Sequence, residues 1–287
     1  MLGLGVSLGK SSFVGGGFDA DYQAVLDYAS DPSRNYTLPS DAHQILQNAI
    51  VVTLKQNDIW DKLDLFYITA GNDQAFCRIN WKNPASNYLT DASGTSPAWT
   101  QYKGFNNTGS DTIETGFDLD GSGQYKLDNA GAFVAFTEMG TQSESNNRPY
   151  GNSGGANFLS PRIDVDGESS VNRNWINGTD YQNPDAELEF FHKDNNTIFF
   201  QNRTNSSTAN YRSTDLANDT STGLVEDGAS NSSSFPSPTE QLVLLRAKGD
   251  YLETTAKIGM FGIGSKLSNA KMQVVETAWY TNYYTQL

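Results

Sequence analysis

The stretch that determines the fold is residues 261–287, "FGIGSKLSNAKMQVVETAWYTNYYTQL". A short apolar run interrupted by glycines gives way to a single helical pattern, with Ser268 or Asn269 at the N-cap position. Large apolar residues then recur every three or four positions and form one stripe: Met272, Val275, Trp279 and Tyr283. Because such a stripe has to be buried, we expect this helix to close the fold against a sheet face, or against the seam between a sheet and other helices.

Upstream of this helix, from Leu63 onward, the chain has a strand-like period of two. The runs are "LDLFYITA", "AFCRINW", "GAFVAFTEM", "PRIDVDG", "AELEFFHKD", "TIFFQNRT", "GLVEDG", "EQLVLLRA" and "AKIGMFGIG". Gly, Asn, Asp, Ser and Pro separate these runs, and no helical pattern lies between them. The fold class predicted for residues 63–287 is therefore mainly β, an antiparallel jelly-roll sandwich that ends on a C-terminal helix.

Residues 19–62 show helical rather than strand periodicity. Asp19 is a candidate N-cap for the first pattern, and Ser40 is a candidate for the second. The apolar stripes expected to pack these helices are Tyr22, Val25, Leu26 and Ala29 in the first and Ile45, Ala49, Val52 and Leu54 in the second. We predict a small helical docking subdomain at residues 19–62, preceded by an extended Gly/Ser arm at residues 1–18 that a partner subunit holds in place.

The composition argues against several classes of protein. The 287 residues carry a formal net charge of -14, and an acidic surface repels the phosphate backbone of nucleic acid. No apolar run has the length of a transmembrane helix and no signal peptide is recognisable, so we expect no membrane and no export by a recognisable route. Cys77 is the only cysteine, so no intrachain disulfide can form.

Two parts of the sequence resemble known families. The segment "IGMFGIGSKLSNAKMQVVETAWYTNYY" resembles the last strand and terminal helix of laminin-G/concanavalin A-like modules, and "ELEFFHKDNNTIFFQNRT" and "EQLVLLRAKGD" fit the strand order before it. The pattern "WDKLDLFY…INWKNP" is similar to a segment of bacteriophage virion proteins, where it precedes a laminin-G-like domain. Together the two resemblances cover roughly residues 19–287.

The resemblance implies a non-enzymatic virion structural protein that is made in the host bacterial cytoplasm. Its arm and helices would dock onto other virion proteins, and its sandwich would project outward and bind host surface glycans. Two locations are left open: a head decoration or head fibre, and a tail fibre or baseplate component. Copies of the chain are expected to assemble with closed symmetry as a homo-oligomer.

A row of carboxylates offers an enzyme as the alternative. Asp185, Glu187 and Glu189 alternate in "DAELEFF", so they share one face of a strand. Glycosidases of concanavalin A-like fold place a nucleophile and an acid/base in such a row, with the carboxyl groups about 5 Å apart in retaining enzymes. The usual order of Glu and Asp differs here, and any half-exposed strand shows the same alternation. We favour the solvent-facing strand and keep a glycan depolymerase as the alternative.

The stretch "DLDGSG" resembles a calcium loop. Asp118, Asp120 and Ser122 occupy positions 1, 3 and 5 of the EF-hand pattern. Asn129 stands at position 12, where that pattern requires glutamate, and Asp-Gly pairs are also ordinary turn residues. We expect no cofactor, and a calcium-dependent carbohydrate-binding module is the alternative that this loop keeps open.

Aromatic residues in polar loops are candidates for stacking on sugar rings. The best cluster lies in "NRNWINGTDYQNP", where Trp175 and Tyr181 flank Asn177, whose amide suits the recognition of hydroxyl groups. Trp99 is a further candidate. The alternative is that such rings plug one end of the sandwich.

Overall fold

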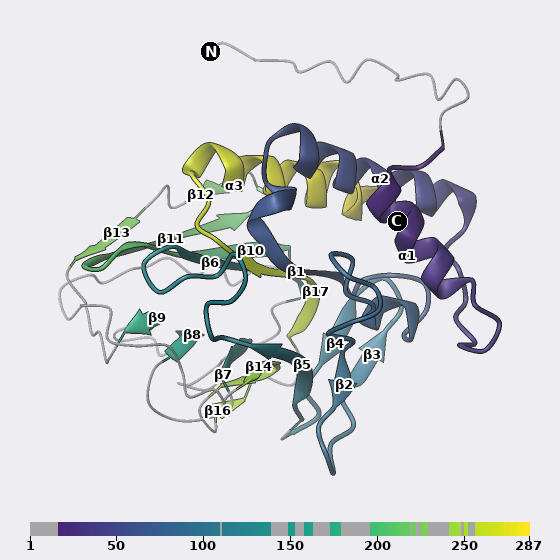
Figure 1. Cartoon of the computed structure of the whole chain (residues 1–287), viewed down its shortest axis with the longest axis horizontal. Helices are drawn as coiled ribbons and strands as arrows, with labels where there is room; N and C mark the ends of the chain where they lie inside the picture. The colour runs from purple at the N-terminus through teal and green to yellow at the C-terminus, as the bar shows by residue number, and fades with distance from the viewer. Residues whose placement is uncertain are drawn as a thin grey trace.

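Three long strands at the centre of the fold are buried on both faces along most of their length, and the central one is an almost uninterrupted apolar run. β6 (Ala130–Glu138) lies between β10 (Thr197–Asn205) and β17 (Lys257–Gly264), and both pairings are antiparallel. An apolar run without alternation is expected for a strand that is covered on both sides. Figure 1 shows the consequence, because the sheet built on these strands lies between a layer of helices and a second sheet.

The structure, a computed structural model, describes residues 17–109, 111–138, 149–152, 158–162, 173–178, 196–218, 220–221, 225–228, 241–247, 250–251 and 256–287. Within these residues the middle layer is a nine-stranded sheet of order β12-β11-β10-β6-β17-β4-β3, in which β1 also pairs with β17 and β13 with β11. Its remaining strands are β1 (Leu63–Ile68), β3 (Ala98–Thr100), β4 (Gly104–Asn106), β11 (Thr208–Asp215), β12 (Thr220–Ser221) and β13 (Val225–Gly228).

The second sheet has the order β2-β5-β14-β7 among the described residues. Its strands are β2 (Thr90–Asp91), β5 (Ile113–Asp118), β14 (Gln241–Leu244) and β7 (Tyr150–Asn152). Two further antiparallel pairs are formed by β8 (Phe158–Arg162) with β9 (Arg173–Gly178), and by β15 (Arg246–Ala247) with β16 (Asp250–Tyr251).

The space between the two large sheets is filled by aromatic and aliphatic side chains. Tyr67, Val134 and Phe261 of the nine-stranded sheet share this core with Tyr150 and Leu242 of the four-stranded sheet. All five residues are fully buried, and the rings of Tyr150 and Phe261 lie 5.0 Å apart. The predicted mainly β, antiparallel sandwich that ends on a C-terminal helix is therefore confirmed.

The other face of the nine-stranded sheet is covered by the α-helices (Figure 1): α1 (Ala20–Ala29), α2 (Asp41–Gln56) and α3 (Asn269–Glu276). A π-helical turn, η3 (Thr277–Thr281), continues α3, and short 3-10 turns occur at η1 (Trp60–Lys62), η2 (Phe76–Arg78) and η4 (Tyr284–Gln286). Val25 of α1 and Leu54 of α2 belong to the same buried cluster as Phe66 and Phe133 of the sheet. Residues 19–62 thus share a core with the strands that follow them.

The closing helix forms where the sequence predicts it. Ser268 is its N-cap, since its hydroxyl accepts a hydrogen bond from the backbone N–H of Lys271 at 3.4 Å. The predicted stripe lies against the sheet with at most 1% of each residue exposed: Met272, Val275, Trp279 and Tyr283. The prediction of a helix that covers a sheet face is confirmed.

Two glycines of β17 explain the glycine-interrupted run that precedes this helix. A Cβ on Gly259 would lie 2.9 Å from the ring of Trp279, and a Cβ on Gly262 would lie 2.3 Å from the ring of Phe133. Distances below 3.0 Å are not tolerated by packed atoms, so any side chain here would displace an aromatic ring. The glycines therefore give the helix and the central strand room to pack closely on β17.

The face of α2 that is buried differs from the one its periodicity predicts. Ile45 is 46% exposed, and Ala49 and Val52 are only partly buried. The buried face instead consists of Gln47, Asn48, Ile50, Val51 and Leu54. Of the predicted stripe, only Leu54 lies in the core, so the predicted stripe of α2 is wrong.

Hydrogen bonds to the two amide side chains explain this orientation of α2. The Tyr22 hydroxyl donates to Gln47 Oε1 at 2.7 Å, and Gln47 Nε2 donates to the Tyr283 hydroxyl at 3.3 Å. The backbone N–H of Asp19 donates to Asn48 Oδ1 at 2.7 Å. Since buried amides are stable only when they are hydrogen-bonded, these contacts fix which face of α2 turns inward.

One predicted strand is a turn in the structure. The run "AFCRINW" forms η2 because the carboxylate of Asp73 accepts a hydrogen bond from the backbone N–H of Phe76 at 2.7 Å and starts a 3-10 turn. Cys77 is buried there, and burial raises the pKa of its thiol to about 12.

Residues 1–16 of the predicted arm lie outside the described residues. None of the described helices is long and apolar enough to span a bilayer.

Candidate functional site

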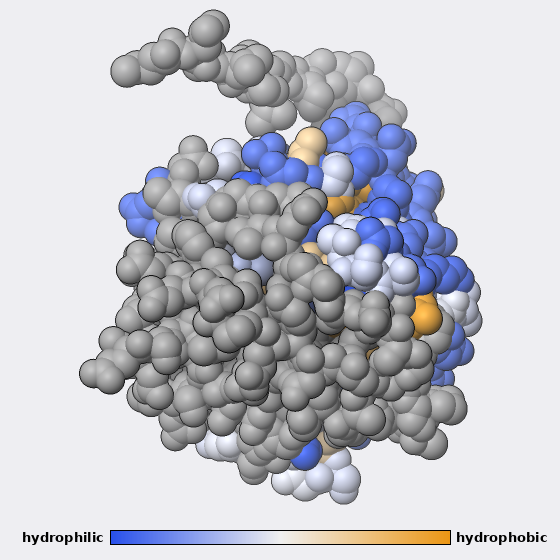
Figure 2. Space-filling model, turned by 90° about the vertical axis from the view of Figure 1, so that its left-hand side faces the viewer, coloured by the Kyte–Doolittle hydropathy of each residue, from blue (hydrophilic) through white to orange (hydrophobic). Residues whose placement is uncertain are grey.

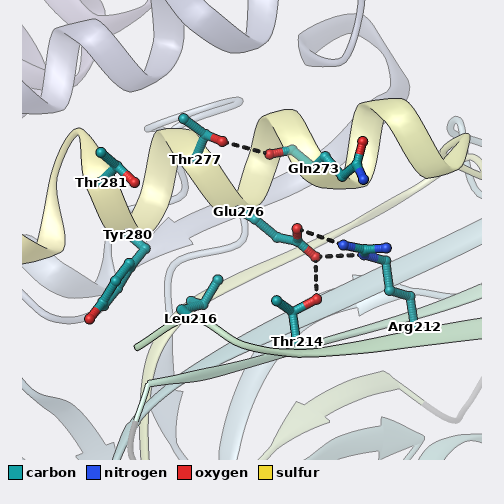
Figure 3. A pocket seen from close by; sticks show the side chains of 8 residues that line it. All are labelled: Arg212, Thr214, Leu216, Gln273, Glu276, Thr277, Tyr280 and Thr281. Atoms are coloured by element: carbon teal, nitrogen blue, oxygen red, sulfur yellow. Dashed lines mark hydrogen bonds and ion pairs between the residues drawn. The ribbon is translucent and has the colours of Figure 1, made fainter. Parts of the chain in front are cut away.

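A pocket lies between the outer part of the nine-stranded sheet and the closing helix (Figure 3). Its volume is about 500 Å³. The lining residues come from β11 and the residue that follows it, and from α3 and η3: Arg212, Thr214, Leu216, Gln273, Glu276, Thr277, Tyr280 and Thr281. The pocket therefore depends on the same helix–sheet packing that closes the fold.

The wall of the pocket is a buried ion pair. Arg212 Nε donates to Glu276 Oε1 at 2.7 Å, and Arg212 Nη2 donates to Glu276 Oε2 at 3.0 Å (Figure 3). The hydroxyl of Thr214 donates to the same Oε1 at 2.6 Å. Arg212 is 5% exposed and Glu276 is 8% exposed. In a buried ion pair, the loss of either partner would leave the other charge buried without a counter-charge, which is strongly destabilising. This pair links α3 to β11.

The guanidinium of Arg212 makes one further contact. Its Nη1 donates to Asn269 Oδ1, at the start of α3, at 3.0 Å. Each nitrogen of the guanidinium thus has an acceptor, and Glu276 accepts from both Arg212 and Thr214. Polar contacts with a ligand would therefore come mainly from the rim, where the side chain of Gln273 is exposed.

The other wall of the pocket is aromatic. Tyr280 is half-buried, and its ring stacks on that of Tyr284 with centroids 6.3 Å apart and an interplanar angle of 29°. Tyr284 in turn stacks on the buried Trp279 at 5.5 Å and 19°. The π-helical turn, in which the Asn282 N–H donates to Thr277 O at 3.1 Å, contains both Trp279 and Tyr280. π-helical turns are frequent at functional sites, because the extra residue re-aims the side chains around it.

Of the predicted sugar-binding residues, Trp99 lies away from this pocket. The Nε1 of Trp99 donates to Thr69 O at 3.0 Å, and its partly buried ring packs against the core between the sheets. Trp175 lies on β9, where its backbone pairs with that of Ser160. The side chains of Trp175 and Asn177, and the whole of Tyr181, lie outside the described residues, so this cluster stays a prediction.

The predicted calcium loop has a defined local structure. Asp120 Oδ1 accepts a hydrogen bond from the backbone N–H of Ser122 at 2.8 Å, and hydrogen bonds from Ser122 lower the pKa of this carboxyl. Asp118 lies on β5 and pairs with Gln241. In the part of the chain that the structure describes, no cluster of three or more His, Cys, Asp or Glu residues is placed to hold a metal. Calcium at Asp118, Asp120 and Ser122 stays a prediction.

This loop is held to the sheet by a carboxylate that the sequence did not single out. The two oxygens of Asp64 accept hydrogen bonds from the backbone N–H groups of Gln124 and Tyr125, at 2.6 and 2.7 Å. A Cβ on Gly123 would lie 2.2 Å from Asp64 Oδ1. Gly123, the last residue of "DLDGSG", thus makes room for Asp64, which is a structural reason for its presence.

The alternative catalytic row, Asp185, Glu187 and Glu189, lies outside the described residues.

Sequence reasoning missed the residues of the pocket. The available signal was Glu276, a carboxylate that directly follows Val275 of the predicted apolar stripe. A charged residue at the edge of a buried helix face requires a partner. Its partner Arg212 lies 64 positions earlier in the chain, however, and no local pattern connects the two.

Comparisons with known proteins found solved structures of low similarity. No family model matches this sequence, and no curated protein is similar to it. Among solved structures, domain 4 of an extracellular arabinanase from Geobacillus stearothermophilus, in complex with arabinotriose, is 10% identical over 75% of this chain and 98% of that one, with a TM-score of 0.47. The binding domain of botulinum neurotoxin serotype D is 10% identical over 78% and 53% of the two chains, with a TM-score of 0.46. A sialidase from Trypanosoma rangeli is 10% identical over 84% and 39%, with a TM-score of 0.42.

These neighbours contradict one expectation drawn from the sequence, namely that the protein is non-enzymatic. An arabinanase domain, arabinofuranosidases and a sialidase are among the similar structures, so we withdraw that expectation. This chain spans only about half or less of the toxin domain and the sialidase. At these identities and TM-scores below 0.5, the likeness identifies no reaction or ligand for this chain.

Proposed function

We propose that this chain is a structural protein of a bacteriophage virion and that it binds a glycan in the pocket between β11 and the closing helix. The virion role is supported by the resemblance of "WDKLDLFY…INWKNP" to virion proteins. Glycan binding is supported by one observation, that Tyr280, held by a stack of rings, lines the same pocket as the Arg212–Glu276 pair.

The chemistry of the pocket suits a neutral sugar. A sugar ring has an apolar C–H face that packs on an aromatic ring, and hydroxyl groups that require directional hydrogen bonds. Tyr280 offers the ring, and the exposed side chains of Gln273 and Thr281 offer amide and hydroxyl groups. Because the charges of Arg212 and Glu276 neutralise each other, the described part of the lining carries no net charge and favours uncharged glycans over anionic ones.

The described residues of the pocket do not form the constellation of a two-carboxylate glycosidase. Those enzymes place two carboxyl groups on either side of the scissile bond, about 5 to 10 Å apart. Among the described residues of the lining, Glu276 is the one carboxylate, and it is held by Arg212 and Thr214. Binding is the activity that the described residues of this pocket support.

Glycan binding is tested by screening the purified chain against an array of surface glycans of bacteria and measuring the Kd of each hit by calorimetry. Tyr280→Ala is expected to weaken binding about tenfold, the equivalent of one lost ring contact. Gln273→Ala, at an exposed position, tests the rim without disturbing the core. Tyr36→Ala is the matched control, because Tyr36 is a half-buried tyrosine stacked on other tyrosines away from this pocket.

Two outcomes would overturn the assignment of the pocket. One is that no glycan binds to the folded chain. The other is that Tyr280→Ala and Gln273→Ala leave Kd unchanged while Trp175→Ala abolishes binding, which would move the site to the cluster predicted from the sequence. Release of reducing ends from a bound glycan, lost in Glu187→Gln, would identify a depolymerase instead.

The virion role is tested separately. Antibodies against the chain are expected to label intact particles of the phage that encodes it, and images of those particles would locate it on the head or on the tail. If purified particles contain no copy of the chain, the virion role is wrong, whatever the glycan measurements show. Anchoring through residues 1–18 stays a prediction, and particles assembled with a chain that lacks them would test it.

A further inference from the structure

Four apolar residues of α2 face away from the core. Ala42 and Ile45 are exposed, and Ala49 and Val52 are partly buried. Their spacing of three, four and three residues puts them on one side of the helix, and we call them the outer stripe. At 1.5 Å per residue the outer stripe is about 15 Å long.

The outer stripe is unusual for the surface of this protein. The side of the molecule shown in Figure 2 is mainly hydrophilic wherever its residues are described. Within the described part of the chain, the large apolar residues that are exposed are Leu38, at 37%, and Ile45, at 46%. Both lie within the few residues around the start of α2, so the unburied apolar surface is local rather than scattered.

The N-terminal segment of the chain reaches the described structure beside this stripe. The backbone N–H of Asp19 donates to Asn48 Oδ1 at 2.7 Å, and the Asp19 carboxylate accepts from Lys55 Nζ at 2.7 Å. Asn48 lies four residues before Val52 of the outer stripe and Lys55 three residues after it, so both are its neighbours on the surface of α2. Residues 1–16 therefore continue from a point next to the outer stripe.

The sequence of that segment matches the outer stripe in character and length. Leu2, Leu4, Val6 and Leu8 alternate with small residues, so an extended chain would present all four on one face. From Leu2 to Leu8 an extended chain measures about 20 Å, close to the length of the stripe. Residues 1–16 include Lys10 and no acidic residue, while the whole chain has a formal net charge of -14, so attraction by the acidic body also favours contact.

We propose that residues 2–8 dock on the outer stripe of the same chain and cover Ile45. Residues 9–16, which contain several glycines and serines, form the connection. A short flexible connection gives the tethered segment an effective concentration of about 1 mM, so weak apolar contacts are enough to hold it. A second copy of the chain would have to exceed that concentration to compete. The proposal does not depend on the proposed glycan or virion function.

A disulfide trapping experiment tests it. The variant Val6→Cys with Ala49→Cys is compared with Val6→Cys with Ala24→Cys, since Ala24 is an exposed alanine on α1 and equally within reach of the segment. The native Cys77 is 1% exposed and does not compete. Under mild oxidation we expect the Val6–Ala49 pair to form an intramolecular disulfide about tenfold faster than the control pair, at a rate independent of protein concentration.

A second variant shows whether apolar contact is the cause. Adding Leu2→Ser, Leu4→Ser and Leu8→Ser to the Val6–Ala49 pair is expected to slow its oxidation to the rate of the control. Equal rates in the two original pairs would overturn the proposal, as would a rate unchanged by the serine substitutions. A disulfide-linked dimer as the main product would overturn it too, because the occupant would then be a second copy.

Discussion

The helices α3 and α2 lie on the same face of the same sheet, yet their sequences relate to their packing in opposite ways. In α3 and η3 the apolar stripe and the buried face coincide, with Met272 and Trp279 fully buried. In α2 the buried face includes Gln47 and Asn48, and Ile45 of the apolar stripe is exposed. Apolar periodicity therefore identifies the buried face of a helix only where hydrogen bonds to buried polar side chains do not favour a different rotation of that helix.

The hydrogen-bond partners of the buried amides of α2 come from distant parts of the chain. Gln47 bonds to residues 25 positions before it and 236 positions after it, and Asn48 bonds to one 29 positions before it. A local pattern carries no information about such partners. The free energy of leaving a buried amide unpaired, about 1 to 3 kcal/mol, is comparable with that of exposing one isoleucine, so the network can set the rotation of the helix.

The largest effect is expected from Trp279→Ala, which removes the side chain that packs η3 against β17. Because Gly259 beneath it has no side chain to fill the space, the cavity would persist. We expect the free energy of unfolding, measured by urea denaturation, to fall by about 3 to 5 kcal/mol. Thr285→Ala, at an exposed position of the same terminal segment, serves as the control. A loss below about 1 kcal/mol would mean that the closing helix does not stabilise the sandwich.

Glu276→Gln is expected to have the second-largest effect and to lower the free energy of unfolding by about 3 kcal/mol, because it leaves the charge of Arg212 buried without a counter-charge. The double variant Arg212→Met with Glu276→Leu removes both charges and should recover most of that loss. Thermal unfolding of the two variants side by side distinguishes an unpaired charge from lost packing. If the double variant is no more stable than Glu276→Gln, the cost lies in packing rather than in the charge.

Gln47→Leu is expected to cost about 1 to 3 kcal/mol, even though it places an apolar residue on a buried helix face. The substitution leaves the hydroxyl of Tyr22 without its acceptor and removes the donor to Tyr283. Adding Tyr22→Phe removes one of these orphaned groups and should restore part of the stability. A stabilising effect of Gln47→Leu alone would show that apolar burial, and not the hydrogen-bond network, sets the orientation of α2.

The parts of the fold that sequence predicts are those whose signals are local. The N-caps Asp19, Ser40 and Ser268 all form as expected, and the strand-like runs that contain β6, β10 and β17 form central strands. The turn at η2 was not predicted, because a single hydrogen bond from Phe76 to Asp73 starts it within a strand-like run. The pocket was not predicted either, because its ion pair joins residues far apart in the sequence.

The smallest effect is expected at Ile45, and its size depends on the N-terminal segment. In a chain that begins at Gly17, Ile45→Ala should change the free energy of unfolding by less than about 0.5 kcal/mol, because the side chain is already 46% exposed. Ile50→Ala, the matched change on the buried face of the same helix, should cost about 2 to 5 kcal/mol. In the full chain, docking of residues 2–8 would bury Ile45 and make its replacement measurably more costly than in the shortened chain. If Ile45→Ala lowers the free energy of unfolding equally in the two chains, residues 2–8 do not cover the outer stripe. The contrast between the exposed and buried faces of α2 would then hold for the full chain as well.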